Sequence, residues 1–173
     1  MKRNLTLLMI MGLIWGILEA SVGTFMHLLH FPFTGQIMSA VGFTIILVLI
    51  RKGYEVKNIP IVILMAALLK LSAFPFVIDK AAVIKPAISI LLEGFAFIGI
   101  LKIIKEFEGF YWCLISSYTV ILFTNLFWAI VGNPLYDVRS FIGLTFIKPF
   151  MTAIFTYLGM KTITITAYLR SFK

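Results

Sequence analysis

The stretch WGILEASVGTFMHLLHFPFTG, residues 15–35, places a glutamate in the middle of an apolar run and two histidines near its end. A run of about 20 mostly apolar residues has the length of a helix that crosses a bilayer. An ionised carboxylate at the centre of such a helix costs at least about 2.5–3.5 kcal/mol when it has no partner. The stretch therefore predicts a membrane helix whose Glu19 is protonated, paired with a cation or turned toward water.

The whole chain has the composition of an integral membrane protein. Of its 173 residues, 61% are hydrophobic and 13% are charged, and the mean hydropathy is +1.07. Soluble domains are about 45–50% apolar and about 25% charged. The formal net charge of +8 does not indicate nucleic-acid binding, because the basic residues lie at the ends of apolar stretches and form no recognition motif. The single cysteine, Cys113, excludes an internal disulfide and a cysteine metal cluster.

We predict an all-α, six-helix membrane bundle that forms a single transmembrane domain, residues 1–173. The first apolar run is too long for a signal peptide and lacks a cleavage site, so it is interpreted as a retained span. Apolar runs and their breaks predict helices at about residues 5–29, 36–50, 59–77, 86–104 and 110–131. A sixth helix is predicted to begin near Phe141 or at Pro149 and to run to about residue 168.

The distribution of basic residues predicts that both termini are cytoplasmic. With six spans, ten basic residues lie on the side of the termini: Lys2, Arg3, Arg51, Lys52, Lys57, Lys102, Lys105, Lys161, Arg170 and Lys173. The opposite side carries four: Lys80, Lys85, Arg139 and Lys148. Cytoplasmic loops carry the excess of Lys and Arg in membrane proteins. The outer segments also hold the polar and aromatic residues, so a site is expected to open outward.

One face of the first helix changes in character along its length. Gly12, Gly16, Glu19, Gly23, His27 and His30 recur every three or four residues, which places them on one helix face. Gly12, Gly16 and Ala20 form a small-xxx-small ridge, which lets another helix approach closely. That ridge packs either against a helix of the same chain or against a separate subunit.

Two further charges fall inside predicted spans, Lys70 and Glu93. Intramembrane ionisable residues face the bundle interior and pair with one another. We therefore expect Glu19, Lys70 and Glu93 to cluster, either as a polar knot that fixes helix packing or as the wall of a binding cavity. His27 and His30 are candidates for substrate hydrogen bonding, for a plain role at the helix end or, less well supported, for metal ligation; no metal site is predicted.

The segments VIKPAISI (residues 83–90) and FIKPFMTA (residues 146–153) repeat the pattern apolar-Ile-Lys-Pro before an apolar run. Proline is favoured in the first helical turn, so Pro86 and Pro149 are expected there or at a break in a helix. Lys85 and Lys148 would then lie at positive helix ends, where an acid is normally preferred. The pattern predicts either an anion site at two helix N-termini or lysines that reach the lipid headgroups.

Other residues expected to line an outward site are the polar Asn125, Asp137 and Arg139, and the ring of Trp15 is expected to contact an apolar ligand body. The sequence contains no phosphate-binding loop for an ATPase and no nucleophile motif. No catalytic residue or cofactor is predicted.

With its small size, six predicted spans, cytoplasmic termini, outward site and small residues at Gly12, Gly16 and Ala20, the chain resembles the substrate-binding S components of energy-coupling factor (ECF) transporters. The resemblance implies uptake of a vitamin-like micronutrient through a prokaryotic plasma membrane. It implies partners on separate chains, a transmembrane coupling subunit and ATPase subunits, with the ridge docking the coupling subunit and residues 27–35 helping to close the site. The substrate is expected to be anionic or zwitterionic.

Two other classes of function remain open at the level of sequence. One is an integral membrane enzyme that acts on a lipid or quinone with Glu19, His27 or His30 as acid–base groups. The other is a non-catalytic assembly protein or a small oligomeric channel. A transporter subunit predicts a tightly bound ligand and co-purifying subunits, an enzyme predicts turnover by the chain alone, and an assembly protein predicts neither.

Overall fold

The computed structural model describes residues 2–29, 31, 33–76, 80–103, 109–131 and 138–170, and these residues form helices and short connections without a β-strand. The α-helices are α1 (Lys2–Leu18), α2 (Thr24–Leu28), α3 (Thr34–Arg51), α4 (Pro60–Ser72), α5 (Ala81–Ile103), α6 (Phe110–Ile130) and α7 (Val138–Arg170). A π-helical segment, η1 (Glu19–Gly23), joins α1 to α2, and its flanking residues Leu18 and Thr24 keep right-handed helical dihedrals. Two 3₁₀ turns, η2 (Val56–Asn58) and η3 (Phe74–Phe76), flank α4.

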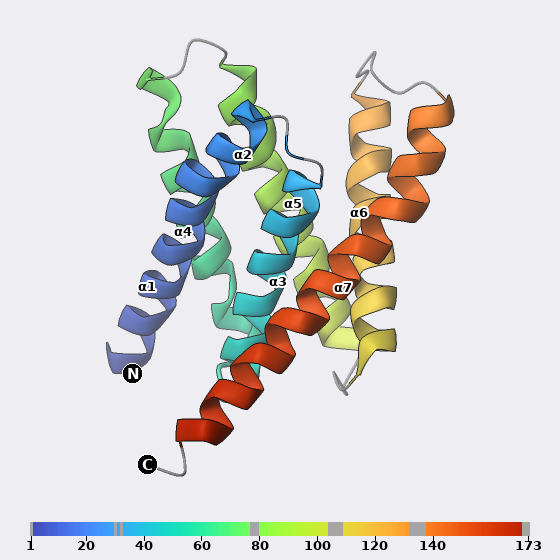
Figure 1. Ribbon diagram of the computed structural model, residues 1–173. Coiled ribbons are helices and arrows are strands. Elements are labelled where there is room, and N and C mark those ends of the chain that lie inside the picture. The colour runs from blue at the N-terminus through green and yellow to red at the C-terminus, as the bar shows by residue number, and fades with distance from the viewer. Residues whose placement is uncertain are drawn as a thin grey trace.

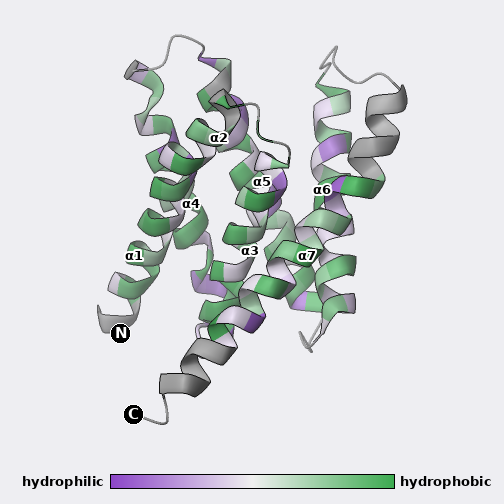
Figure 2. Ribbon diagram, viewed as in Figure 1, coloured by the Kyte–Doolittle hydropathy of each residue, from purple (hydrophilic) through white to green (hydrophobic). Residues whose placement is uncertain are grey.

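Within the described part of the chain, four helical segments are long and apolar enough to cross a membrane: Leu5–Met26, Thr34–Arg51, Val83–Ile103 and Phe110–Ile130. Figure 2 shows the apolar character along these helices, which is interrupted only by short hydrophilic segments. Large apolar side chains also face outward, such as Leu68 and Phe25, both 61% exposed. Such a surface is a liability in water and suits contact with lipid. The protein is therefore a membrane-embedded helical bundle.

Two helices differ from the predicted spans. α4 has 13 residues, about 20 Å of helix at 1.5 Å per residue, and it stops before the Phe74-Pro75-Phe76 turn. α7 has 33 residues and passes through Pro149 without ending. α4 is not among the helices that qualify as spans, because it has only 13 residues.

Local signals explain the ends of α3 and α4. Gly53 follows α3 with φ +83°, its N–H bonds to the carbonyl of Ile50, and the N–H of Tyr54 bonds to the carbonyl of Leu49. These are the two hydrogen bonds of a Schellman C-cap, which needs a left-handed residue and favours glycine. Pro60 opens α4 in its first turn, where a missing N–H costs nothing. The chain reversal at residues 52–60 is therefore encoded locally.

The helices form a ring in which α1 contacts α4, α4 contacts α5, α5 contacts α6, α6 contacts α7, α7 contacts α3, and α3 returns to α1. α3 also contacts α5 across the ring and divides it into two halves. The helices run alternately up and down, so that α1 begins and α7 ends at the same end of the bundle, the lower end in Figure 1. The first residues of α3 and α5 lie at the upper end (Figure 1).

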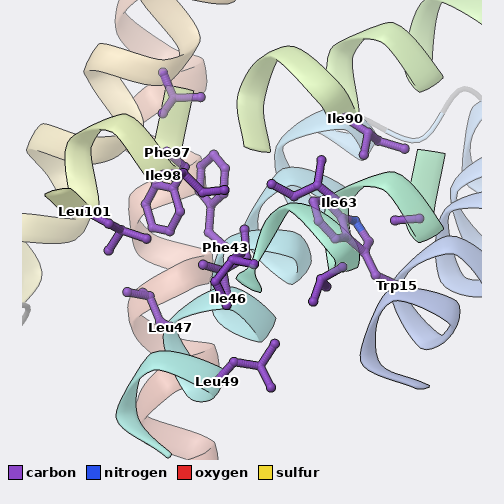
Figure 3. Close-up of a cluster of buried hydrophobic side chains, with 14 of the residues drawn as sticks. Trp15, Phe43, Ile46, Leu47, Leu49, Ile63, Ile90, Phe97, Ile98 and Leu101 are labelled. Atoms are coloured by element: carbon purple, nitrogen blue, oxygen red, sulfur yellow. The ribbon is translucent and has the colours of Figure 1, made fainter. Parts of the chain in front are cut away.

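The hydrophobic core fills the half made by α1, α3, α4 and α5. Trp15 and Ile63 lie together there, and the rings of Phe43 and Phe97 stack where α3 meets α5 (Figure 3). Their centroids are 4.4 Å apart and their planes differ by 11°. Most of the buried polar residues lie on α3, α6 and α7, which together with α5 form the other half and line a cavity there.

Candidate functional site

A cavity of about 270 Å³ lies among η1, α3, α5, α6 and α7, and we call it the upper cavity. Its lining residues are Glu19, Gly35, Gln36, Met38, Ser39, Lys85, Pro86, Ser89, Ile90, Glu93, Ile121, Thr124, Asn125, Trp128 and Lys148. Helical periodicity explains how they converge: on α5, residues 85, 89 and 93 follow one another every four residues on one face. Two acids and two lysines thus meet at one place in an otherwise apolar bundle.

Glu93 is the best-connected acid of the upper cavity. The hydroxyl of Ser39 donates a hydrogen bond to its Oε2 at 2.5 Å and so links α5 to α3. The ammonium group of Lys148, on α7, lies close enough to interact electrostatically with the Glu93 carboxylate. Glu93 therefore links α5 to α3 by a hydrogen bond and interacts with Lys148 of α7 at longer range, while its carboxyl group borders the cavity.

A second polar link joins α5 to α6 at the same cavity. The indole N–H of Trp128 donates to the hydroxyl of Ser89 at 3.2 Å. The hydroxyl of Thr124 donates to the carbonyl of Val120 at 3.0 Å. Asn125 is buried beside them at 5% exposed. These groups form the α5 and α6 side of the cavity.

Glu19 lies on the η1 side of the upper cavity, and Lys70 stands behind it. Lys70 is 1% exposed, and its ammonium group donates to the backbone carbonyl of Glu19 at 2.9 Å and to the hydroxyl of Thr24 at 3.1 Å. Lys70 does not line the cavity. It holds the π-helical turn in place, and π-turns within helices occur frequently at functional sites.

Glu19 lies between the other two members of the predicted cluster, because its carboxyl group is near enough to interact electrostatically with Lys70 and with Glu93. Lys70 binds the main chain of Glu19 from the core side, whereas Glu93 faces the cavity with Ser39 and Lys148. Among the described residues, neither acid forms an ion pair within 4 Å with a lysine or arginine. Both carboxyl groups are thus available to a ligand that carries its own cation.

The lysines predicted from the Ile-Lys-Pro repeat both line the upper cavity, but not at helix N-termini. The expectation that Pro86 and Pro149 occupy first turns or breaks is wrong, because both lie inside continuous helices, α5 from Ala81 and α7 from Val138. Proline inside a membrane helix is tolerated when neighbouring helices satisfy the backbone. The positive charge that these two segments bring to the cavity therefore comes from the ammonium groups and not from the N-termini of α5 and α7.

Other predicted residues are placed elsewhere or are not described. Trp15 is 2% exposed in the core and does not line the cavity, and its indole N–H has no hydrogen-bond partner among the described residues. The main chains of His27 and Arg139 lie in α2 and α7, but their side chains fall outside the described part of the structure. His30 and Asp137 lie outside the described residues altogether.

The glycine ridge of the first helix packs inside the chain. A Cβ atom at Gly12 would lie 2.7 Å from the carbonyl oxygen of Val62, and one at Gly16 would lie 2.7 Å from Cβ of Leu69, both on α4. The hypothesis that Gly12, Gly16 and Ala20 dock a partner subunit therefore does not fit these glycines, because α4 already occupies that face. Close approach of α1 to α4 is what the ridge provides.

Four polar cavity residues were not singled out from the sequence: Gln36, Ser39, Ser89 and Thr124. Their signal was available, since a glutamine and a serine three residues apart in a mostly apolar span mark one face of that helix.

Comparison with protein-family models, with curated proteins and with solved structures gives no match. The site is therefore interpreted from its own geometry.

Proposed function

We propose that this chain is the substrate-binding membrane subunit of a micronutrient uptake transporter and that the upper cavity binds a small zwitterionic ligand. The observation that carries the proposal is the meeting of Glu19, Glu93, Lys85 and Lys148 around one cavity. Such charges are costly inside a membrane and are usually kept for binding or transport. The volume of about 270 Å³ suits a small metabolite, just below the common range of about 300–1,000 Å³ for ligand pockets.

The balance of charges favours a zwitterion over a plain anion. Lys85 and Lys148 offer ammonium groups to a carboxylate or phosphate, while Glu93 and Glu19 offer carboxyl groups to an amine. The neutral donors Gln36, Ser39 and Asn125 add orientation without net charge. The apolar wall of Ile90, Ile121 and Met38 would hold a short carbon skeleton.

The same proposal includes six membrane crossings with cytoplasmic termini in a prokaryotic plasma membrane. α4 with its flanking turns η2 and η3 would supply a short crossing, and α7 would supply a tilted one. The side of the bundle where α1 begins and α7 ends carries most of the basic residues, which supports a cytoplasmic lower end. Separate coupling and ATPase subunits would provide the energy.

The first experiment is native mass spectrometry of the gently purified protein, followed by titration of the ligand it releases. Lys85→Ala and Lys148→Ala should each weaken binding about tenfold to a hundredfold, because a hydrogen bond to a charged group contributes roughly 1.5–3 kcal/mol. Lys102→Ala is the matched control, since Lys102 is exposed on the same helix as Lys85 but lies outside the cavity. Unchanged affinity in the Lys85/Lys148 double variant refutes the site, and turnover of a lipid by the purified chain refutes the transport function.

A further inference from the structure

A second cavity, of about 260 Å³, lies at the lower end among α3, α5, α6 and α7, and it shares no lining residue with the upper cavity. We call it the lower cavity. Its polar wall consists of Arg51, Cys113, Ser116, Ser117, Thr156 and Lys161. None of the proposed roles of the upper cavity uses these residues.

Three hydroxyl groups in this wall are buried without a partner. Ser116, Ser117 and Thr156 are 2%, 1% and 1% exposed, and their hydroxyls have no hydrogen bond within the described residues. Hydroxyls in helices normally bond to the carbonyl four residues earlier, as those of Thr119 and Thr164 do at 2.9 Å. Buried polar groups left unpaired are rare and call for an explanation. A ligand with oxygen acceptors would supply their missing partners.

The charge of the lower cavity is positive. Arg51, at the end of α3, lies 3.5 Å from the hydroxyl of Thr164 through its NH1 atom, and the ammonium of Lys161 stands 5.5 Å from the centroid of the Tyr157 ring. No acidic residue is among the described residues that line this cavity. The upper cavity, in contrast, contains two acids. Hydroxyl donors together with guanidinium and ammonium groups are the chemistry that recognises an oxyanion.

We propose that the lower cavity is a second binding site, separate from the upper one, and that it takes a phosphate-type oxyanion. The oxyanion is either free or carried by an anionic lipid headgroup, because basic pockets between membrane helices bind such headgroups and a free phosphate presents the same oxygens. Arg51 and Lys161 attract the anion, and Ser116, Ser117 and Thr156 donate to its oxygens. This proposal does not depend on whether the upper cavity binds a ligand.

The thiol of Cys113, the chain's single cysteine, reports on the lower cavity because it lines the wall. The purified full chain in phosphatidylcholine nanodiscs is treated with an anionic or a cationic methanethiosulfonate reagent. The anionic reagent should react about tenfold faster, relative to a free thiol, because a positive cleft concentrates anions by that order. Inorganic phosphate should slow the reaction.

Matched variants separate the cavity from the general charge of the lower end. Arg51→Gln with Lys161→Gln should abolish the preference for the anionic reagent and the protection by phosphate. Lys52→Gln with Lys102→Gln removes the same charge from exposed positions outside the cavity and should leave both intact. Ser117→Ala with Thr156→Val should weaken phosphate protection while keeping the preference for the anionic reagent.

Nanodiscs that contain phosphatidylglycerol distinguish the two sources of the oxyanion. Protection of Cys113 by this lipid without added phosphate assigns a headgroup, and protection by phosphate in phosphatidylcholine alone assigns a free anion. Equilibrium dialysis with radiolabelled phosphate on the same variants decides the matter if the thiol is inert. Equal reagent rates together with no protection by either anion, or no phosphate bound on dialysis when the thiol is inert, overturn the proposal.

Discussion

Lys70 is a lysine that the fold has removed from both water and lipid. Its ammonium group is satisfied by the carbonyl of Glu19 and the hydroxyl of Thr24, and the Glu19 carboxyl lies near enough to attract it. Burying a charge is costly unless it is paired and hydrogen-bonded. Lys70 therefore links α4 to the π-helical turn, and its contribution to stability depends on both hydrogen-bond partners being present.

Lys70→Ala should lower the free energy of unfolding by about 3–5 kcal/mol, since removal of one partner leaves buried polar groups uncompensated. Glu19→Gln combined with Lys70→Ala should cost less than the sum of the two single changes, with a coupling of roughly 0.5–3 kcal/mol. Denaturant unfolding in detergent measures all three variants. Strictly additive costs would show that Lys70 supports the backbone alone and that the Glu19 charge plays no part.

At the scale of helices, the contact between α1 and α4 depends on two residues that have no side chain. Gly12 and Gly16 allow the backbones to approach so closely that an added Cβ would meet Val62, Met65, Ala66 and Leu69. Gly99 on α5 has nothing within 4 Å of the corresponding position. Glycine is therefore needed for close helix packing on α1 but not at Gly99 on α5.

Gly16→Ala should lower the free energy of unfolding by about 1–3 kcal/mol, because the overpacked site must move atoms of α4. Gly99→Ala, the matched control, should be neutral or stabilising by up to about 1 kcal/mol, since alanine favours the helix and meets no obstacle. Thermal unfolding in detergent gives both values. A neutral Gly16→Ala would mean that α1 and α4 are not in close contact.

The helices themselves were well predicted because hydropathy and turn residues act locally. The run predicted at 110–131 is α6, Phe110–Ile130, and the run at 36–50 is α3, Thr34–Arg51. The predicted start of α5, at Pro86, lies five residues after its actual start at Ala81. The prediction relied on the preference of proline for the first helical turn, whereas Pro86 lies inside the helix. The π-helical turn at Glu19 was not predicted, since the group that bonds to its carbonyl, the ammonium of Lys70, lies 51 residues away in the sequence.

The candidate site was predicted in part for a similar reason. Glu19, Lys85, Glu93, Asn125 and Lys148 were proposed because charge or amide groups are rare in apolar spans, and they do line one cavity. Trp15 was proposed from its distance along the helix to Glu19, but the packing of α1 against α3 and α4 turns it into the core. Residue type indicates that a group is unusual, whereas only tertiary packing decides which neighbours it meets.

At the scale of the whole molecule, one thin layer separates the two cavities. Ser39 and Glu93 line the upper cavity, and Phe43 and Phe97, one helical turn further along α3 and α5, line the lower one. The stacked rings and the fully buried Val120 lie at this level. The half of the bundle that contains both cavities is therefore closed in its middle.

The orientation of the bundle predicts which surface each loop occupies. Lys57→Cys and Lys80→Cys, in a Cys113→Ala background, place one thiol at the lower end and one at the upper end, both at exposed positions. A membrane-impermeant maleimide applied to intact cells should label residue 80 and spare residue 57 until the membrane is opened. Labelling of both positions from outside would contradict cytoplasmic termini with an outward upper cavity.

The placement of the three tryptophans has a consequence for observing this protein. Trp128 lines the upper cavity, Trp112 lines the lower one, and Trp15 is sealed in the core. Each compartment therefore contains its own fluorophore, and replacing two tryptophans by phenylalanine leaves an emission spectrum that reports from one compartment alone. Occupation of either cavity should shift the emission of the variant that keeps the tryptophan lining that cavity, while the variant that keeps only Trp15 serves as the reference.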